Sequence, residues 1–116
     1  MTDLLALTAE IVDIASESRN EQELVAWLEA GLARIASLEL HRVGDNLVAR
    51  TDLGRSRRLI LAGHTDTVPA NGNERARIVG DRLYGVGSTD MKSGLAVMLE
   101  AARSIVEPAV DVTYVF

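Results

Sequence analysis

The first of two stretches whose residues could perform chemistry is LAGHTDTVPA, residues 61–70. A short apolar run ends there, and His64 and Asp66 follow it before Pro69 stops the extended pattern. Residues two apart in extended backbone point to the same side, so the imidazole and the carboxylate can face one pocket or contact each other. A carboxylate bonded to one ring nitrogen makes the other nitrogen a better metal ligand. The pair alone predicts either a metal site or a strand-end histidine held by a turn aspartate.

A second stretch, YGVGSTDMKSG at residues 84–94, places another carboxylate at the start of an expected helix. Gly85 and Gly87 permit a tight turn, and Asp90 stands where a dinucleotide-binding G-x-G-x-x-G motif has its last glycine. A carboxylate at this point would compete with a phosphate for the helix N-terminal amides and repel it, whereas it serves well as a ligand for a cation. Asp90 is therefore either a metal ligand or a helix N-cap.

Taken together, the segments GHTDTVP and GVGSTDMKSGLAVML resemble the co-catalytic zinc amidohydrolases and exopeptidases of the aminoacylase and carboxypeptidase G type. The resemblance runs along essentially the whole chain. It implies that His64 binds one of two zinc ions, that Asp66 is a catalytic residue that orients this histidine, and that Asp90 bridges both metals. Cobalt or manganese would fit the same ligands. The resemblance also implies a cis peptide bond between Asp90 and Met91.

Within this family the two motifs look most similar to those of the desuccinylases, which implies a particular reaction. Such a metal-dependent hydrolase cleaves the amide of N-succinyl-LL-2,6-diaminopimelate to succinate and diaminopimelate in lysine biosynthesis, with a glutamate as the base. Acetylornithine deacetylases, aminoacylases and carboxypeptidases share both motifs and are the alternatives. The partner implied is a small-molecule N-acyl amino acid substrate.

The resemblance also implies what these 116 residues lack. In the family, the glutamate pair that supplies the base and a ligand follows the strand that corresponds to DVTYVF. Another carboxylate ligand, a distal histidine and an inserted dimerisation domain lie further on. We therefore expect residues 1–116 to form a single, incomplete metallohydrolase catalytic domain, without the domain that makes family members homodimers. The alternative from another class is a non-catalytic fragment or a weak metal-binding module.

Composition limits the other possibilities. A chain of 116 residues that is 47% hydrophobic has the size of one domain with one core. Its net charge of −5 gives no long-range attraction to nucleic acid or to anionic lipid. Cysteine is absent, and no apolar run approaches the roughly 20 residues of a membrane span. We expect a cytoplasmic protein with neither a nucleic-acid nor a membrane partner.

Apolar spacing predicts alternating helices and strands. Helices are expected at 3–17, with Thr2 or Asp3 as the cap, at 20–35, which begins with the N-x-x-E spacing of a capping box, and at 91–105. Strands are expected at 38–43, 46–51, 59–62, 112–116 and, as a second hairpin, 77–84. These elements predict an α/β fold, a mixed sheet with flanking helices. The resemblance makes this fold the N-terminal part of a zinc-exopeptidase-like catalytic domain.

Two strands and several side chains carry specific expectations. The run 59–62 is continuously apolar, which is typical of a strand covered on both faces. The run 112–116 is expected to form an exposed sheet edge that could pair with another chain. Outside the two motifs we expect structural residues only: a surface His41, a solvated Lys92, and Ser16 and Ser18 in a loop or cap.

Overall fold

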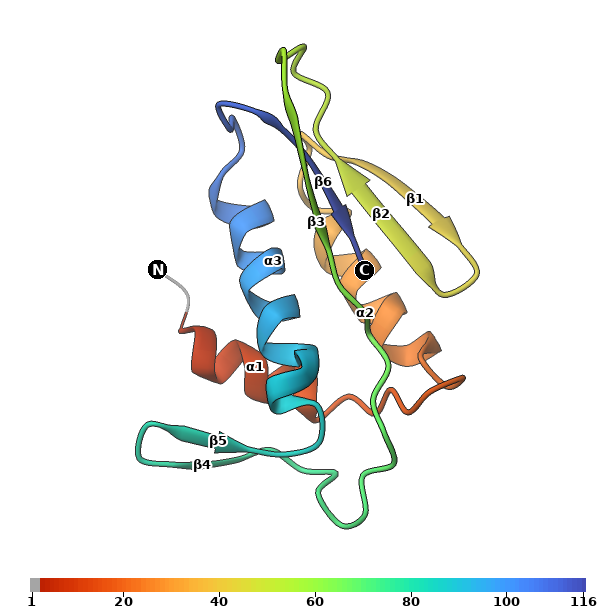
Figure 1. The fold of residues 1–116 in the computed structure, drawn as a ribbon, viewed down its shortest axis with the longest axis vertical. Coiled ribbons are helices and arrows are strands. Elements are labelled where there is room, and N and C mark those ends of the chain that lie inside the picture. The colour runs from red at the N-terminus through yellow and green to blue at the C-terminus, as the bar shows by residue number, and fades with distance from the viewer. Residues whose placement is uncertain (1–2) are drawn as a thin grey trace.

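The structure, a computed structural model, describes residues 3–116 and has an α/β fold (Figure 1). Its helices are α1 (Leu4–Val12), α2 (Gln22–Leu32) and α3 (Ser93–Ser104). Its strands are β1 (Glu39–Val43), β2 (Asn46–Arg50), β3 (Arg58–Ala62), β4 (Arg77–Val79), β5 (Arg82–Tyr84) and β6 (Asp111–Val115), and the irregular turn η1 (Ser88–Lys92) precedes α3. The predicted elements are thus confirmed, the helices being shorter than expected. Within residues 3–116, no helix has the length and apolar character needed to cross a membrane.

The main sheet is mixed, with the strand order β1-β2-β6-β3. The neighbours β1 and β2 pair antiparallel, as do β2 and β6, whereas β3 runs parallel to β6. The short hairpin of β4 and β5 forms a separate ribbon. The expectation that 112–116 forms an exposed edge is therefore wrong. This segment is a central strand because it bonds to partners on both sides, a long-range pairing that local sequence patterns do not reveal.

The core lies between the sheet and the helices. In β2 the buried residues Leu47 and Ala49 alternate with less buried ones, and in β6 Val112 and Tyr114 do the same. This alternation is typical of strands that bury one face. The helices supply the other half of the core through residues that are at most 6% exposed: Leu7, Ile11, Leu24, Val25, Leu28, Leu32, Leu95, Ala96, Met98, Leu99 and Ala102.

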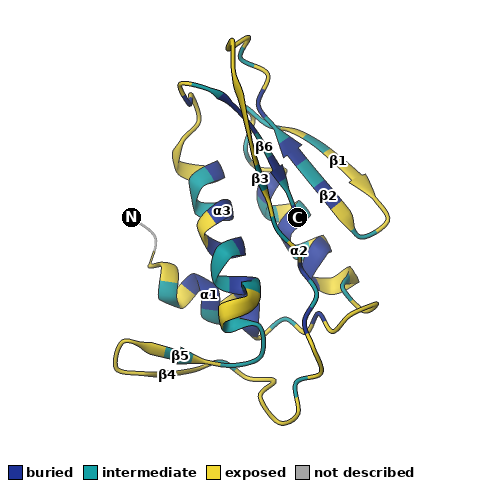
Figure 2. Ribbon diagram, viewed as in Figure 1, coloured by how far each residue is buried: buried dark blue, intermediate teal, exposed yellow. Residues whose placement is uncertain are grey.

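Strand β3 is not covered on both faces, so that prediction is wrong. Leu59 is 48% exposed and Ile60 is 62% exposed, and most of this strand is coloured as exposed in Figure 2. Only Leu61 packs against the core. The partner strand β6 buries one face of the sheet, and Ile60 lies beside Thr113 on the other, less buried face. Within residues 3–116, β3 is also the last strand of this sheet. A continuous apolar run does not distinguish an interior strand from an apolar edge strand.

The helix N-termini agree with the sequence in one case and differ in the other. Asp3 caps α1, since its Oδ1 accepts hydrogen bonds from Leu5 N at 2.9 Å and Ala6 N at 3.2 Å. The alternative cap, Thr2, lies outside the described residues. The expected capping box at the start of α2 is wrong. The N-cap residue there is Glu21, and its side chain makes no capping bond but accepts from Arg19 N at 2.7 Å instead.

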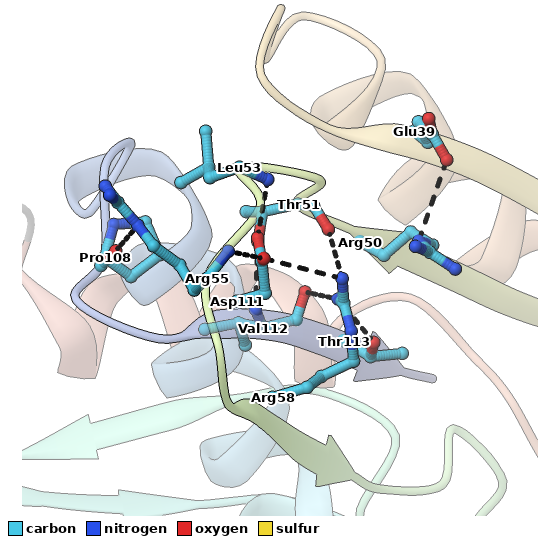
Figure 3. Close-up of polar contacts among 10 residues, drawn as sticks. All are labelled: Glu39, Arg50, Thr51, Leu53, Arg55, Arg58, Pro108, Asp111, Val112 and Thr113. Atoms are coloured by element: carbon cyan, nitrogen blue, oxygen red, sulfur yellow. Dashed lines mark hydrogen bonds and ion pairs between the residues drawn. The ribbon is translucent and has the colours of Figure 1, made fainter.

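A buried carboxylate at the start of β6 is the centre of a group of polar contacts (Figure 3). Asp111 is 2% exposed, and its oxygens accept from Thr51 Oγ1 at 2.7 Å, Leu53 N at 2.8 Å and Arg55 N at 2.8 Å. The backbone N–H of Leu53, together with these other donors and nearby Arg58, lowers the pKa of Asp111 to about 2. Asp111 thereby anchors the loop between β2 and β3 onto β6.

Candidate metal site at the end of strand β3

The two motifs meet at the carboxyl end of β3. Gly63 continues this strand by donating to Val115 O at 2.8 Å, and His64 follows it directly. The turn η1 brings Asp90 to the same place, where its Oδ1 lies 2.8 Å from His64 Nε2. The structure thus brings together the histidine of the first motif and the aspartate of the second, which lie 26 residues apart in sequence.

Asp66 occupies the other side of the imidazole. Its carboxylate Oδ1 is 3.3 Å from His64 Nδ1, and its backbone oxygen is 3.1 Å from the same nitrogen. The predicted contact between residues two apart is therefore present. Burial lowers the pKa of His64, but the hydrogen bonds to Asp90 and to the Asp66 backbone, with both carboxylate charges, outweigh it and leave the pKa raised.

Asp90 does not cap α3. Its side chain is 84% exposed and faces His64, and the residue at the N-cap position of α3 is Lys92, which makes no side-chain capping bond. Asp90 and Met91 have non-helical backbone angles, with φ of −129° and −135°, and a cis peptide bond joins them as the resemblance implied. Of the two alternatives for Asp90, the helix N-cap is therefore wrong.

Glycines are required in the turn that leads to Asp90. Gly87 has φ of +78°, and a Cβ there would lie 2.6 Å from Thr67 Cγ2. The turn therefore packs directly against the segment that carries Asp66. Beside this contact an open cleft of about 370 Å³ is lined by Ser18, His64, Asp66, Gly87, Ser88 and Asp90 among others.

Lys92 is buried, so the expectation of a solvated lysine is wrong. It is 1% exposed, and its Nζ donates to Ile14 O at 2.7 Å beyond the end of α1. Burial lowers its pKa to about 8, against an opposing effect of Asp13. The side chain reaches from η1 to the residues that follow α1, a contact that depends on how the two elements pack. Lys92 ties the turn that holds Asp90 to the first helix.

Of the other polar residues singled out in the sequence, two lie away from the site and one contacts it. His41 is exposed on β1, which confirms that it is a surface residue. Ser16 is a buried loop residue that donates to Thr65 O at 2.6 Å. Ser18, in contrast, reaches the site, since its Oγ donates to Asp66 Oδ2 at 2.8 Å. No local pattern indicates this contact, because 48 residues separate the two side chains.

The donors present fit part of a zinc site. His64 Nε2 and Asp90 Oδ1 face each other at 2.8 Å. At zinc–ligand distances of about 2.0–2.2 Å, two donors of a tetrahedral shell lie about 3.3–3.6 Å apart, so a small separation of the two side chains would accommodate the ion. Asp66 at Nδ1 is the kind of partner that metal-binding histidines have. However, residues 3–116 contain no group of three or more histidine, aspartate or glutamate side chains that could hold a metal.

Comparison with known proteins places this geometry in context. Residues 60–116 match the family described as Peptidase family M20/M25/M40. Proteins named as succinyl-diaminopimelate desuccinylases from Mycobacterium tuberculosis and Corynebacterium glutamicum are 48% and 41% identical over 98% and 89% of this chain. An acetylornithine deacetylase from Aliivibrio fischeri is 35% identical over 72% of the chain. The chain spans 32%, 28% and 23% of these relatives, about a third of their length or less.

Solved structures of similar fold are also found. A tripeptidase from Staphylococcus aureus has a TM-score of 0.80 and 28% identity, covering 97% of this chain and 35% of that one. An M20 family metallo-carboxypeptidase from Sulfolobus solfataricus has a TM-score of 0.79 and 20% identity, covering 99% and 30%. A zinc-dependent exopeptidase from Parabacteroides distasonis has a TM-score of 0.68 and 20% identity, covering 97% and 44%. The predicted zinc-exopeptidase-like α/β fold is confirmed.

Proposed function

Because this chain belongs to peptidase family M20/M25/M40, we propose that it carries part of the metal centre of a hydrolase that cleaves N-succinyl-LL-2,6-diaminopimelate to succinate and diaminopimelate, a reaction of lysine biosynthesis. One observation carries the proposal. His64 Nε2 lies 2.8 Å from Asp90 Oδ1, while the carboxylate of Asp66 lies at the opposite ring nitrogen. This is the arrangement expected when one nitrogen is oriented by a carboxylate and the other is offered to a metal.

The three side chains have separate roles in this proposal. His64 would hold one metal ion, Asp90 would supply a carboxylate ligand to both ions, and Asp66 would keep the imidazole oriented. Two zinc ions are proposed, with cobalt or manganese as substitutes that suit the same donors. Such a pair, when bound, supplies Lewis-acid chemistry to an amide carbonyl. Lys92 and the glycine turn contribute only by holding Asp90 where it meets His64.

The proposal assigns residues 1–116 to a single, incomplete catalytic domain that does not turn over substrate alone. Two donors are fewer than the three protein ligands of a typical catalytic zinc site. Among the described residues, no glutamate joins His64 and Asp90 in a group that could hold a metal. A base, further ligands and the domain that makes the family homodimeric would have to come from outside this chain. A cytoplasmic location, and the lack of a nucleic-acid or membrane partner, stay predictions of the sequence.

The substrate has alternatives within the family. The two desuccinylase relatives, at 48% and 41% identity, are more similar to this chain than the acetylornithine deacetylase at 35%, which is why succinyl-diaminopimelate is placed first. Acetylornithine deacetylase, aminoacylase and carboxypeptidase activities come next. The alternative from another class is a non-catalytic module that binds one metal ion weakly. For these 116 residues alone, this alternative predicts the same weak binding and the same lack of turnover as the proposal. The two differ in whether the chain is part of an enzyme.

Zinc titration calorimetry on the 116-residue chain tests the proposal, alongside an assay for succinate release from succinyl-diaminopimelate. We expect weak zinc binding that is lost in His64→Ala and Asp90→Ala and reduced in Asp66→Ala. His41→Ala is the matched control, because it removes the only other imidazole and should leave binding unchanged. Unchanged binding in His64→Ala or Asp90→Ala would contradict the metal site. Succinate release by the chain alone would contradict the proposal that its site lacks a base.

A further inference from the structure

Ser18 makes a side-chain contact with the site that none of the roles above uses. Its Oγ donates to Asp66 Oδ2 at 2.8 Å, while the other oxygen of that carboxylate faces His64 Nδ1 at 3.3 Å. The hydroxyl also lies 3.2 Å from Thr67 O. A hydroxyl has one hydrogen to donate, and the shorter bond to a charged oxygen is the stronger of the two. Ser18 therefore bonds to the oxygen of Asp66 that does not face His64.

The backbone fixes where this hydroxyl lies. Ser18 N donates to Thr67 O at 3.0 Å, and Thr67 N donates to Ser16 O at 2.9 Å, so the two segments run side by side as a short parallel bridge. The buried bond from Ser16 Oγ to Thr65 O, at 2.6 Å, adds a third link. The hydroxyl thus comes from a segment that is hydrogen-bonded on both sides of Asp66.

We propose that Ser18 is a positioning residue for the metal site, an inference that rests on the function proposed above. The side chain of Asp66 is 44% exposed, so without a second partner its carboxylate is free to rotate towards solvent. By holding Oδ2, Ser18 keeps Oδ1 directed at His64 Nδ1. The imidazole is then held with Nε2 towards Asp90. Ser18 thus positions Asp66, and Asp66 positions the imidazole of His64 for the metal.

The first test measures zinc affinity in a double-mutant cycle of Ser18→Ala and Asp66→Ala on the 116-residue chain. Losing a partner behind a metal ligand typically lowers affinity 10- to 100-fold, so we expect Ser18→Ala alone to lower zinc affinity by about tenfold. In the Asp66→Ala background it should have no further effect, because Ser18 acts only through that carboxylate. Ser18→Thr, which keeps the hydroxyl, should retain most of the affinity.

Ser104→Ala is the matched control, since its hydroxyl bonds to Glu100 on α3 at 2.8 Å. It should not change zinc affinity. An equal loss from Ser18→Ala in both backgrounds would overturn the inference, because Ser18 would then act on the loop and not through Asp66. If His64→Ala and Asp90→Ala abolish binding but Ser18→Ala has no effect, the inference alone fails. If none of these variants affects binding, the proposed metal site fails and the inference fails with it.

A second test needs no metal. The chain has two histidines, so ¹⁵N spectra of its imidazoles report His64 with His41 as an internal reference. We expect Ser18→Ala to shift the His64 signals in the same direction as Asp66→Ala does, and to leave His41 unchanged. Thermal unfolding of the metal-free variant should match that of the parent chain, since Ser18 is exposed. Unchanged His64 signals in Ser18→Ala would overturn the inference whether or not zinc binds.

Discussion

Replacing Gly87 by alanine tests whether the turn before Asp90 is packed as tightly as the structure indicates. Gly87 has φ of +78°, a region that disfavours L side chains by about 1–2 kcal/mol. The new Cβ would lie 2.6 Å from Thr67 Cγ2 and 3.2 Å from Lys92 Cδ, and both of these side chains are buried. Because overpacking costs about 1–3 kcal/mol, we expect Gly87→Ala to lower the free energy of unfolding by about 2–5 kcal/mol.

Two other glycines separate the contributions to this loss. Gly44 has φ of +61°, and a Cβ at this position would have nothing within 4 Å, so Gly44→Ala should lose only the backbone contribution of about 1–2 kcal/mol. Gly63 has no such φ, but its Cβ would lie 2.6 Å from Met91 Cε, the flexible end of a side chain. Gly63→Ala therefore measures the cost of a close contact with a side chain that can move away, without a backbone contribution.

Urea unfolding followed by the fluorescence of Trp27, which packs against the core, measures all three variants. The expected order of destabilisation places Gly87→Ala above both controls. If Gly87→Ala were no more destabilising than Gly44→Ala, the segment that carries Thr67 would not be in contact with the turn. Such a result would refute a role for this contact in placing Asp90 opposite His64.

Three further variants test other parts of the structure. Asp111→Asn should destabilise the chain at neutral pH. The pKa of Asp111 is lowered from 3.8 to about 2, so its stabilising contribution is present above pH 3.8 and is lost as the pH falls towards 2. As the pH falls across that range, the urea midpoint of unfolding should fall less steeply in the variant than in the parent chain. An equally steep fall in both would contradict the stabilising role of the ionised Asp111. Lys92→Ala removes a buried side chain and its bond to Ile14 O. Urea unfolding should show that the free energy of unfolding falls by about 2–4 kcal/mol. A fall of less than about 1 kcal/mol would mean that Lys92 does not hold η1 against α1. His41→Ala should change the free energy of unfolding by less than about 0.5 kcal/mol, since the residue is exposed on β1. A larger change would contradict its surface position.

Much of the fold could be predicted because its signals are local. The apolar faces of the helices, and the turns at Gly44 and Gly80 within the two hairpins, depend on residues close together in sequence. The contact between His64 and Asp66 also follows from the two-residue period of extended backbone. The approach of Asp90 was indicated by the resemblance of two motifs and not by spacing alone.

Two of the wrong predictions, and the contact of Ser18 that the sequence did not indicate, concern contacts between distant segments. Whether 59–62 is covered on both faces depends on which elements pack on each face of the sheet, and Ile60 lies beside Thr113 on the less buried face. Lys92 is buried because η1 packs on α1, and the bond that Ser18 makes to Asp66 spans 48 residues. In each of these cases tertiary packing decided between conformations that the local sequence allows. The capping-box prediction failed locally instead, because the N-cap residue of α2 is Glu21 and not Asn20.

The central position of β6 has a consequence for the order in which the fold assembles. In the part of the chain that the structure describes, β2 and β3 are not neighbours, and β3 joins the sheet only through β6. The pairing of Ile60 with Thr113 closes a loop of more than 50 residues, whereas the β1–β2 hairpin closes over a few. Contacts of such high sequence separation slow folding, because loop-closure entropy opposes them until they form. We therefore expect the hairpin to form early and the end of β3, where His64 lies, to become ordered late, when β6 docks.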